Sequence, residues 1–188
     1  MVRWFDSHIC AEDGEWCGLE NFRMGAHHYQ LALVPSAFAD DLSDDLWERD
    51  DLWSEQPAIT LLRELRSLLP KDTSWADVEE FESENDWGSD LRIFRDGQRD
   101  GPVESIVFRF SPVADSREVL ERFLTTARRH GLLVYARASQ RIMQPKIEIV
   151  ERDLKQSTAY RFISDPGAAL SEAAANVKMP KIKVSKLD

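Results

Sequence analysis

Alternation of apolar and polar residues along several short stretches of the chain predicts strands that have one buried face. In residues 27–35, Tyr29, Leu31 and Leu33 share one side, and the run stops at a proline. Residues 90–97 and 101–112 alternate in the same way, and an Asp-Gly turn begins the polar loop between them. We therefore expect these two segments to pair as an antiparallel hairpin. Shorter strands are expected in residues 132–138 and in the RIMQ segment that follows.

Three other stretches repeat their apolar residues every three or four positions, which is typical of amphipathic helices. The first is expected within 57–70, with a proline in its first turn. The second, within 115–131, is expected to be capped by Asp115 or Ser116 and to end at Gly131. A third is expected from Pro145 to residue 163. The inward-facing residues predicted for these helices are Ile59, Leu62, Leu65 and Leu69, then Val119, Leu120, Phe123, Leu124 and Ala127, then Ile147, Val150, Leu154 and Tyr160.

Residues 73–90 are compatible with more than one structure. A short helix capped by Thr73 or Ser74 could open this stretch, and a strand is expected near 78–83.

The order of these elements is strand, helix, hairpin strands, helix, strand and helix. This order predicts an α+β fold with a largely antiparallel sheet and helices packed on one face. We expect residues 1–26 to be an irregular N-terminal segment, 27–176 to form a single α+β domain and 177–188 to be a flexible basic tail. The sequence leaves open whether residues 1–26 are ordered.

Negative charge is concentrated in one part of the chain. The formal net charge is −10, yet residues 40–90 hold 17 Asp or Glu and only four Lys or Arg, so this segment alone carries −13. Such a field repels nucleic acid and anionic membranes and attracts basic partners. We therefore expect a protein partner with a basic surface, no nucleic acid and no membrane. The sequence does not determine the oligomeric state.

Tryptophans lie among the acids of this segment, and aromatic side chains surrounded by charge are typical of surfaces that bind another protein. The alternative is that the tryptophans hold an acidic loop against the core of their own chain. The predicted partner-binding residues are Asp40, Asp41, Asp44, Asp45, Trp47, Asp50, Asp51 and Trp53 in the first acidic run, and Glu79, Glu82, Glu84, Asp86 and Trp87 in the second.

A metal site is the alternative chemistry. All but one of the chain's Cys and His residues lie within the first 28 positions, namely His8, Cys10, Cys17, His27 and His28. Zinc prefers four such ligands, but the short Cys-x-x-Cys spacing is missing. In a strand, His27 and His28 would point to opposite faces, so at most one could join a site. A metal-dependent enzyme that uses these residues or the clustered carboxylates therefore stays as the second hypothesis.

No motif indicates another catalytic chemistry. The chain has no Gly-x-Ser-x-Gly elbow and no phosphate-binding glycine loop. Acids on an exposed run all lie in water, whereas an acid–base pair needs two different environments. We therefore expect no enzyme activity and no cofactor. The N-terminus lacks an apolar signal core and the chain has only two cysteines, so we expect a cytoplasmic location.

The segment ESIVFRFSPVADSREVLERFLTTARRHGLLVYARASQRIMQP (104–145) resembles small acidic bacterial immunity proteins of polymorphic-toxin systems. The similarity lies in a Phe- and Arg-containing strand, a helix with a basic C-terminus and a Gly cap, and a short following strand. The resemblance implies a cytoplasmic protein that binds and neutralises a cognate toxin, such as a basic nuclease, without catalysis. It implies no role for any individual residue, and it does not identify the toxin or its activity.

Overall fold

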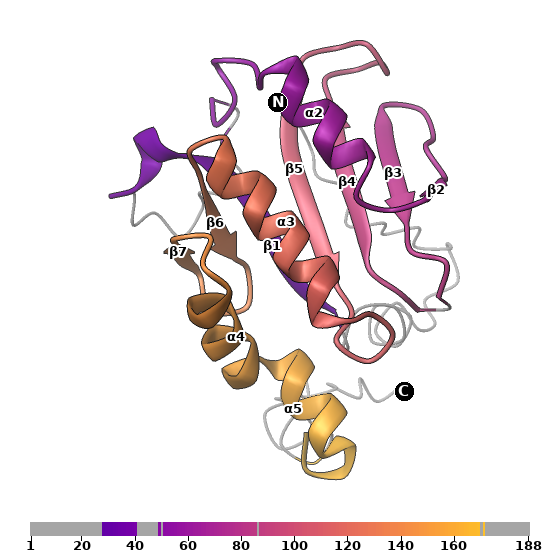
Figure 1. Cartoon of the computed structure of the whole chain (residues 1–188), viewed down its shortest axis with the longest axis vertical. Helices are drawn as coiled ribbons and strands as arrows, with labels where there is room; N and C mark the ends of the chain where they lie inside the picture. Colours follow the sequence, from indigo (N-terminus) through magenta and orange to yellow (C-terminus); the bar gives the residue numbers. More distant parts are fainter. Residues whose placement is uncertain (1–27, 41–48, 50, 86, 170, 172–188) are drawn as a thin grey trace, which may run out of the picture.

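Seven strands form one antiparallel sheet in the order β2-β3-β4-β5-β1-β6-β7 (Figure 1). The computed structural model describes residues 28–40, 49, 51–85, 87–169 and 171. The strands are β1 (Tyr29–Pro35), β2 (Lys71–Asp72), β3 (Val78–Glu82), β4 (Asp90–Arg95), β5 (Val103–Phe110), β6 (Leu132–Ala136) and β7 (Arg141–Met143). Every strand pair is antiparallel, which confirms the predicted α+β fold.

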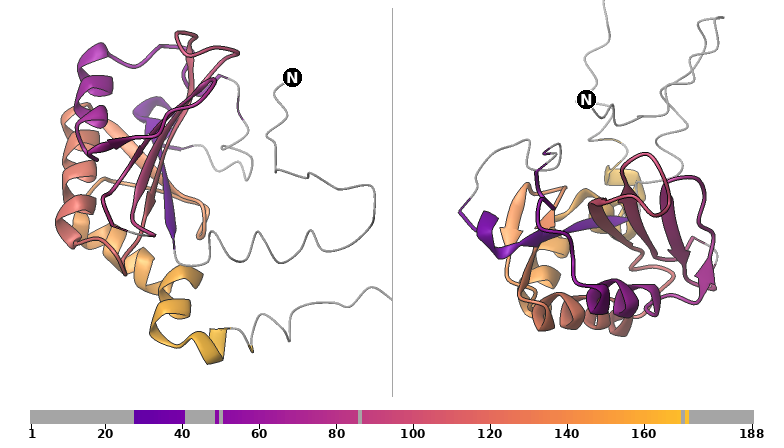
Figure 2. Two further views of the ribbon diagram at one scale, coloured as in Figure 1. Left: turned by 90° about the vertical axis from the view of Figure 1, so that its right-hand side faces the viewer. Right: turned by 90° about the horizontal axis from the view of Figure 1, so that it is seen from above.

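The helices cover one face of the sheet (Figure 2). Helices α2, α3 and α4 lie side by side along this face, and α5 continues beyond its edge. The helices are η1 (Ser36–Phe38), α2 (Ile59–Arg66), α3 (Arg117–Arg129), α4 (Ile147–Gln156) and α5 (Thr158–Ser164). The expected hairpin of residues 90–112 is present as β4 and β5.

The core lies between the helices and the strand positions that the alternation identified. Tyr29, Leu31 and Leu33 are each at most 1% exposed. On β5, Phe108 stacks on Phe123 of α3, with ring centroids 4.4 Å apart. Each large apolar side chain buried in this way stabilises the fold by about 1.5–3 kcal/mol.

In two places, local hydrogen bonds give the chain a structure that differs from the helix considered in the sequence analysis. Residue 157 divides the helix expected from Pro145 into α4 and α5, because the Ser157 side chain accepts a hydrogen bond from the Tyr160 backbone N–H and caps α5. The short helix that the sequence left open after residue 73 is a tight turn instead. Asp72 accepts a hydrogen bond from the Ser74 backbone N–H, and Trp75 pairs with Val78 across the turn.

Smaller corrections concern two helix starts. Ile59, expected to face inward, is the first residue of α2 and is 69% exposed. Ser116 is the N-cap of α3 but its side chain makes no capping hydrogen bond. Asp115 instead accepts hydrogen bonds from Asn85 and from the Ser89 backbone N–H, so it fixes the loop between β3 and β4. Although burial raises the pKa of Asp115, these hydrogen bonds outweigh it and leave that pKa below its ordinary value.

One buried polar contact joins β1 to α4. The Tyr29 hydroxyl donates to Asp153 Oδ2 at 2.6 Å, and both side chains are buried. Burial, together with this hydrogen bond, raises the pKa of Tyr29. A buried acceptor that loses its donor costs more than the bond itself contributes, because water cannot replace the donor.

We predict that Tyr29→Phe lowers the free energy of unfolding by about 1–3 kcal/mol, because Asp153 would stay buried without its donor. Tyr160→Phe is the matched control, since Tyr160 is only partly buried and the change is expected to stay within about 0.5 kcal/mol. Urea unfolding followed by tryptophan fluorescence measures both. Equal, small effects of the two substitutions would contradict the importance of the Tyr29–Asp153 contact.

Candidate functional site

The described residues that follow the two acidic runs lie at opposite ends of β5. Gln56, which follows the first run, accepts a hydrogen bond from the Val103 backbone N–H at 2.6 Å, at the start of β5. Ser89, which follows the second run, accepts one from the Ser111 backbone N–H at 3.0 Å, just past the end of β5. The eight residues of β5 extend about 26 Å at the usual strand rise. The described residues at the ends of the two runs are therefore separated by the length of β5 (Figure 1).

In the second run, Glu79 faces the helix layer. Its carboxylate pairs with Arg66 of α2 at 2.7 Å and with Arg95 of β4 at 2.6 Å. The Glu79 residue is 5% exposed. Its inclusion among the partner-binding residues is corrected, because Phe81 faces the core and a residue two positions away on the same strand must face the same side.

Two opposing effects act on the pKa of Glu79. Burial raises this pKa, but the hydrogen bonds and positive charges of Arg66 and Arg95 together lower it more, so the net shift is downward. A carboxyl group whose pKa is lower in the folded state stabilises the fold above the unfolded-state pKa, and this contribution disappears as the pH falls through the folded-state pKa.

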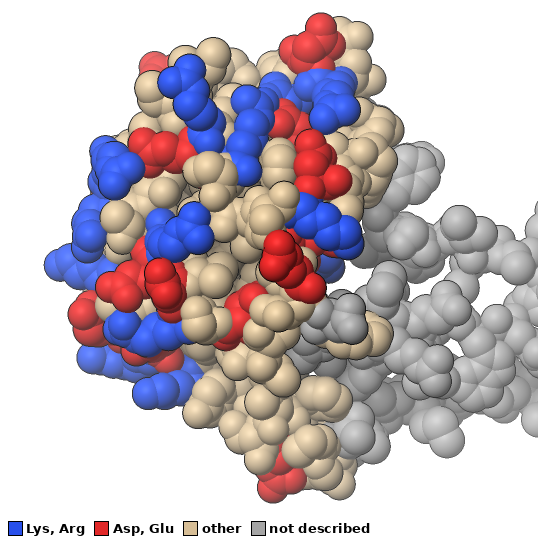
Figure 3. Space-filling model, turned by 45° about the vertical axis from the view of Figure 1, so that its right-hand side comes forward, with Lys and Arg blue, Asp and Glu red and all other residues tan. Residues whose placement is uncertain are grey.

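On the opposite face of the sheet, acids and arginines form a continuous network across β3, β4 and β5. Glu80 pairs with Arg92 at 2.6 Å, Arg92 contacts Asp90 at 3.2 Å, and Asp90 pairs with Arg109 at 2.7 Å. This group of two acids and two arginines has no net formal charge. At the sheet edge, Lys71 pairs with Glu82 at 2.6 Å. Lys and Arg side chains also lie among the acids on the face drawn in Figure 3.

Little of the second run therefore stays available as negative surface. Glu82 is paired with Lys71, while Glu84 and Trp87 are exposed, Trp87 by 66%. Asp86 lies outside the described residues. Trp87 and Glu84 border a polar pocket of about 240 Å³ that also includes His28 and Arg109. Since Arg109 is paired with Asp90, this pocket presents no strong charge of one sign.

In the first run, the described residues divide between surface and core. Asp40 and Asp51 are exposed. Trp53 is 4% exposed and belongs to the hydrophobic core, so the expectation that it lies on the surface as an anchor is corrected in favour of the alternative, packing within its own chain. The remaining predicted residues, Asp41, Asp44, Asp45, Trp47 and Asp50, lie outside the described part of the chain.

A pocket of about 410 Å³ with both apolar and polar lining opens beside the described acids of this run. It lies between η1, the segment before α2, and the residues that join α3 to β6. Its apolar lining consists of Pro35, Phe38, Leu52, Trp53, Pro57, Leu61 and Leu132, and its polar lining includes Glu55, Gln56 and His130. Ligand pockets of proteins usually have about 300–1,000 Å³.

Two contacts hold the walls of this pocket in place. Arg49 lies over the ring of Phe38, 4.9 Å from its centroid, and forms paired hydrogen bonds of 2.7 Å with Asp51. These hydrogen bonds lower the pKa of Asp51. On the other wall, Gln56 donates to the Trp53 carbonyl at 2.7 Å while it pairs with Val103 of β5. The segment before α2 is thus fixed to the start of β5.

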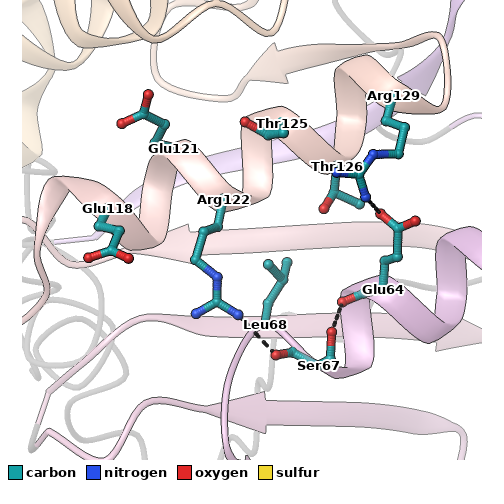
Figure 4. A pocket seen from close by; sticks show the side chains of 9 residues that line it. All are labelled: Glu64, Ser67, Leu68, Glu118, Glu121, Arg122, Thr125, Thr126 and Arg129. Carbon is teal, nitrogen blue, oxygen red and sulfur yellow. Dashed lines mark hydrogen bonds and ion pairs between the residues drawn. The ribbon is translucent and has the colours of Figure 1, made fainter.

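A second groove, of about 400 Å³, lies between α2 and α3 (Figure 4). Its arginines are used within the chain. Arg122 donates to the Ser67 carbonyl at 3.1 Å, and Arg129 pairs with Glu64 at 2.7 Å. These bonds tie the two helices together, so we interpret the groove as a helix–helix boundary.

The metal hypothesis concerns residues that lie mostly outside the described part of the chain. His8, Cys10, Cys17 and His27 are among these, and His28 Nε2 lies 3.0 Å from the Gly88 carbonyl oxygen. In the described ranges, no group of three or more His, Cys, Asp or Glu residues is arranged to hold a metal ion. The metal hypothesis for the N-terminal residues stays a prediction.

Comparison with known proteins finds no matching family model, no matching curated protein and no matching solved structure. Within the described residues, none of the helices has the length and apolar character required to cross a bilayer.

The sequence reasoning missed Phe38, Gln56 and His130 as pocket residues. No sequence pattern connected these three residues, because the pocket combines segments that are far apart in the chain. The only local signal was the proline that ends β1, which turns the chain into η1 and so positions Phe38.

We predict that Glu79→Gln lowers the free energy of unfolding at pH 7 by about 3 kcal/mol, because Arg66 and Arg95 would lose their buried counter-charge. The deficit relative to wild type should shrink below about pH 4, near the unfolded pKa of a glutamate. Denaturant unfolding at pH 7 and pH 3 tests this, with the exposed Glu84→Gln as control. A deficit that is the same at both pH values would contradict it.

Proposed function

We propose that this protein is a cytoplasmic immunity-type protein that binds and neutralises a toxin with a basic surface, such as a nuclease. The proposed binding surface consists of the acids of segment 40–55 and the pocket lined by Phe38, Glu55 and Leu61. No catalysis is involved, because occupying the basic surface of the toxin is sufficient to block its access to substrate.

The observation that carries this proposal is the difference between the two ends of the sheet. The second acidic run is largely balanced by Arg66, Arg92, Arg95, Arg109 and Lys71. Segment 40–55 has eight acids and one arginine. The loop 96–101 between β4 and β5 lies at the same end and adds two aspartates and one arginine. Among the described residues of this segment and this loop, Asp40, Asp51, Glu55, Asp96 and Asp100 are accompanied only by Arg49 and Arg99, and this excess of negative charge suits the capture of a positively charged protein.

Long-range attraction raises the rate of encounter, and apolar contact then slows dissociation. The acids of segment 40–55 supply the first effect. The pocket lined by Phe38 and Leu61 supplies the second, and Ile59, which is 69% exposed, extends the apolar surface at the start of α2.

We predict that the double variant Asp40→Lys/Glu55→Lys associates with its partner about tenfold more slowly than wild type at low salt, because charge steering changes association rates by about 10–10³-fold. The full-length chain is first used to capture the partner from its own cells, and association rates are then measured in low and high salt. In about 1 M salt the difference should nearly vanish, since charges are screened within about 3 Å.

The matched control is Glu84→Lys/Glu118→Lys, which changes the net charge by the same amount at the other end of the sheet and on the helix face. This control should associate nearly as fast as wild type. Growth rescue during co-expression with the captured protein then tests neutralisation, and Asp40→Lys/Glu55→Lys should rescue less well. Equal slowing by both double variants would show that only net charge matters and would contradict the proposed surface.

A further inference from the structure

We infer that the pocket between η1 and α2 receives a single apolar side chain, of leucine or phenylalanine size, that projects from a basic segment of the partner. This inference rests on the proposed function and specifies the chemistry of the partner. It concerns only described residues.

The lining of the pocket sets the first requirement. Its lining combines apolar side chains, such as Phe38, Leu52, Leu61 and Leu132 from separate parts of the fold, with the polar side chains of Glu55, Gln56 and His130. A charged group that reaches the apolar part of this lining loses hydration, whereas Glu55 offers a cation an ion pair. An apolar side chain has no favourable hydration to lose and is stabilised by leaving water, so it is the favoured occupant.

One lining residue has a hydrogen-bond donor without a described partner, and this donor suits a backbone carbonyl of the incoming segment. The indole Nε1–H of Trp53 is buried and has no hydrogen-bond acceptor among the described residues. A buried donor without an acceptor costs about 1–3 kcal/mol. A carbonyl group of an inserted peptide would relieve this cost after a small opening of the wall, whereas a free hydrocarbon would not.

The acidic residues around the pocket indicate which charges should flank the apolar side chain in the partner. Glu55 lines the pocket, and Asp51 is tied through Arg49 to the ring of Phe38. Asp40 follows two residues after Phe38 and is exposed. Lysines or arginines on either side of the apolar anchor would therefore meet carboxylates around the mouth. Apolar anchors inside a charged rim are the usual arrangement of strong protein–protein contacts.

Two synthetic peptides test the inference, one with the sequence Lys-Arg-Lys-Phe-Lys-Arg-Lys and one with alanine in place of phenylalanine. Binding to the whole chain is measured by calorimetry at low salt. The phenylalanine peptide should bind at least about tenfold more tightly, because its ring is removed from water. Chemical-shift change of the Trp53 indole proton should accompany its binding only.

Filling the pocket should remove this preference. Ala37→Trp and Ala58→Trp place a large ring at two exposed positions of the lining, on different elements, so that one variant still reports if the other fails to fold. In both, the affinity ratio of the two peptides should fall to about one. Ala168→Trp, at an exposed position beyond α5, is the matched control and should keep the ratio.

The outcomes separate this inference from the proposed function. Equal affinity of wild type for both peptides, with weaker binding of both by Asp40→Lys/Glu55→Lys, would overturn the pocket assignment and leave the acidic surface in place. A preserved tenfold preference that Asp40→Lys/Glu55→Lys does not weaken would support the pocket and contradict the acidic surface. Absence of binding by either peptide would overturn both.

Discussion

The pairing of buried carboxylates with arginines determines how this chain distributes its charge. Glu79, Glu80 and Asp90 project from strands where little water reaches them, and an unpaired buried carboxylate costs several kcal/mol. Arginines from α2, β4 and β5 surround these acids on both faces of the sheet. The sheet can therefore contain acidic strands, but those acids contribute little outward field.

This constraint leaves one end of the molecule different from the other. At the β3–β4 end, the loop is fixed by Asp115, and its described acid Glu84 lines the same pocket as Lys71 and Arg109. At the η1–α2 end, Asp40 and Glu55 are exposed, and the pocket lined by Phe38 and Trp53 lies beside them. Charge and apolar surface thus occur together at the η1–α2 end, which is the combination that a protein-binding surface needs.

The fold was largely predictable because burial leaves local periods in the sequence. Alternation in 90–112 identified the β4–β5 hairpin, and the stripe through Phe123 identified α3. The errors arose where side chains compete with the backbone for hydrogen bonds, as Ser157 and Asp72 do, because periodicity does not register such bonds.

The candidate site was only partly predictable. A count of charges treats every carboxylate as exposed. The arginines that form hydrogen bonds with Glu79, Glu80 and Asp90 lie 12 to 19 residues away and are brought near by strand pairing and by α2. Phe81 provided one usable signal. Because Phe81 is apolar and faces the core, Glu79, two positions away on the same strand, must face the core as well. The pocket beside Trp53 depends on η1, α2 and β6 together, and no local pattern specifies that assembly.

The most direct test of this account is the near-surface electrostatic potential, residue by residue, from paramagnetic relaxation of amide protons by a cationic and an anionic nitroxide of the same size. We expect a strongly negative potential at Asp40, Ser54 and Glu55 and a value near zero at Glu82, Glu84 and Trp87. Equally negative potentials at the two ends of the sheet would contradict the claim that arginine pairing confines the field to one end.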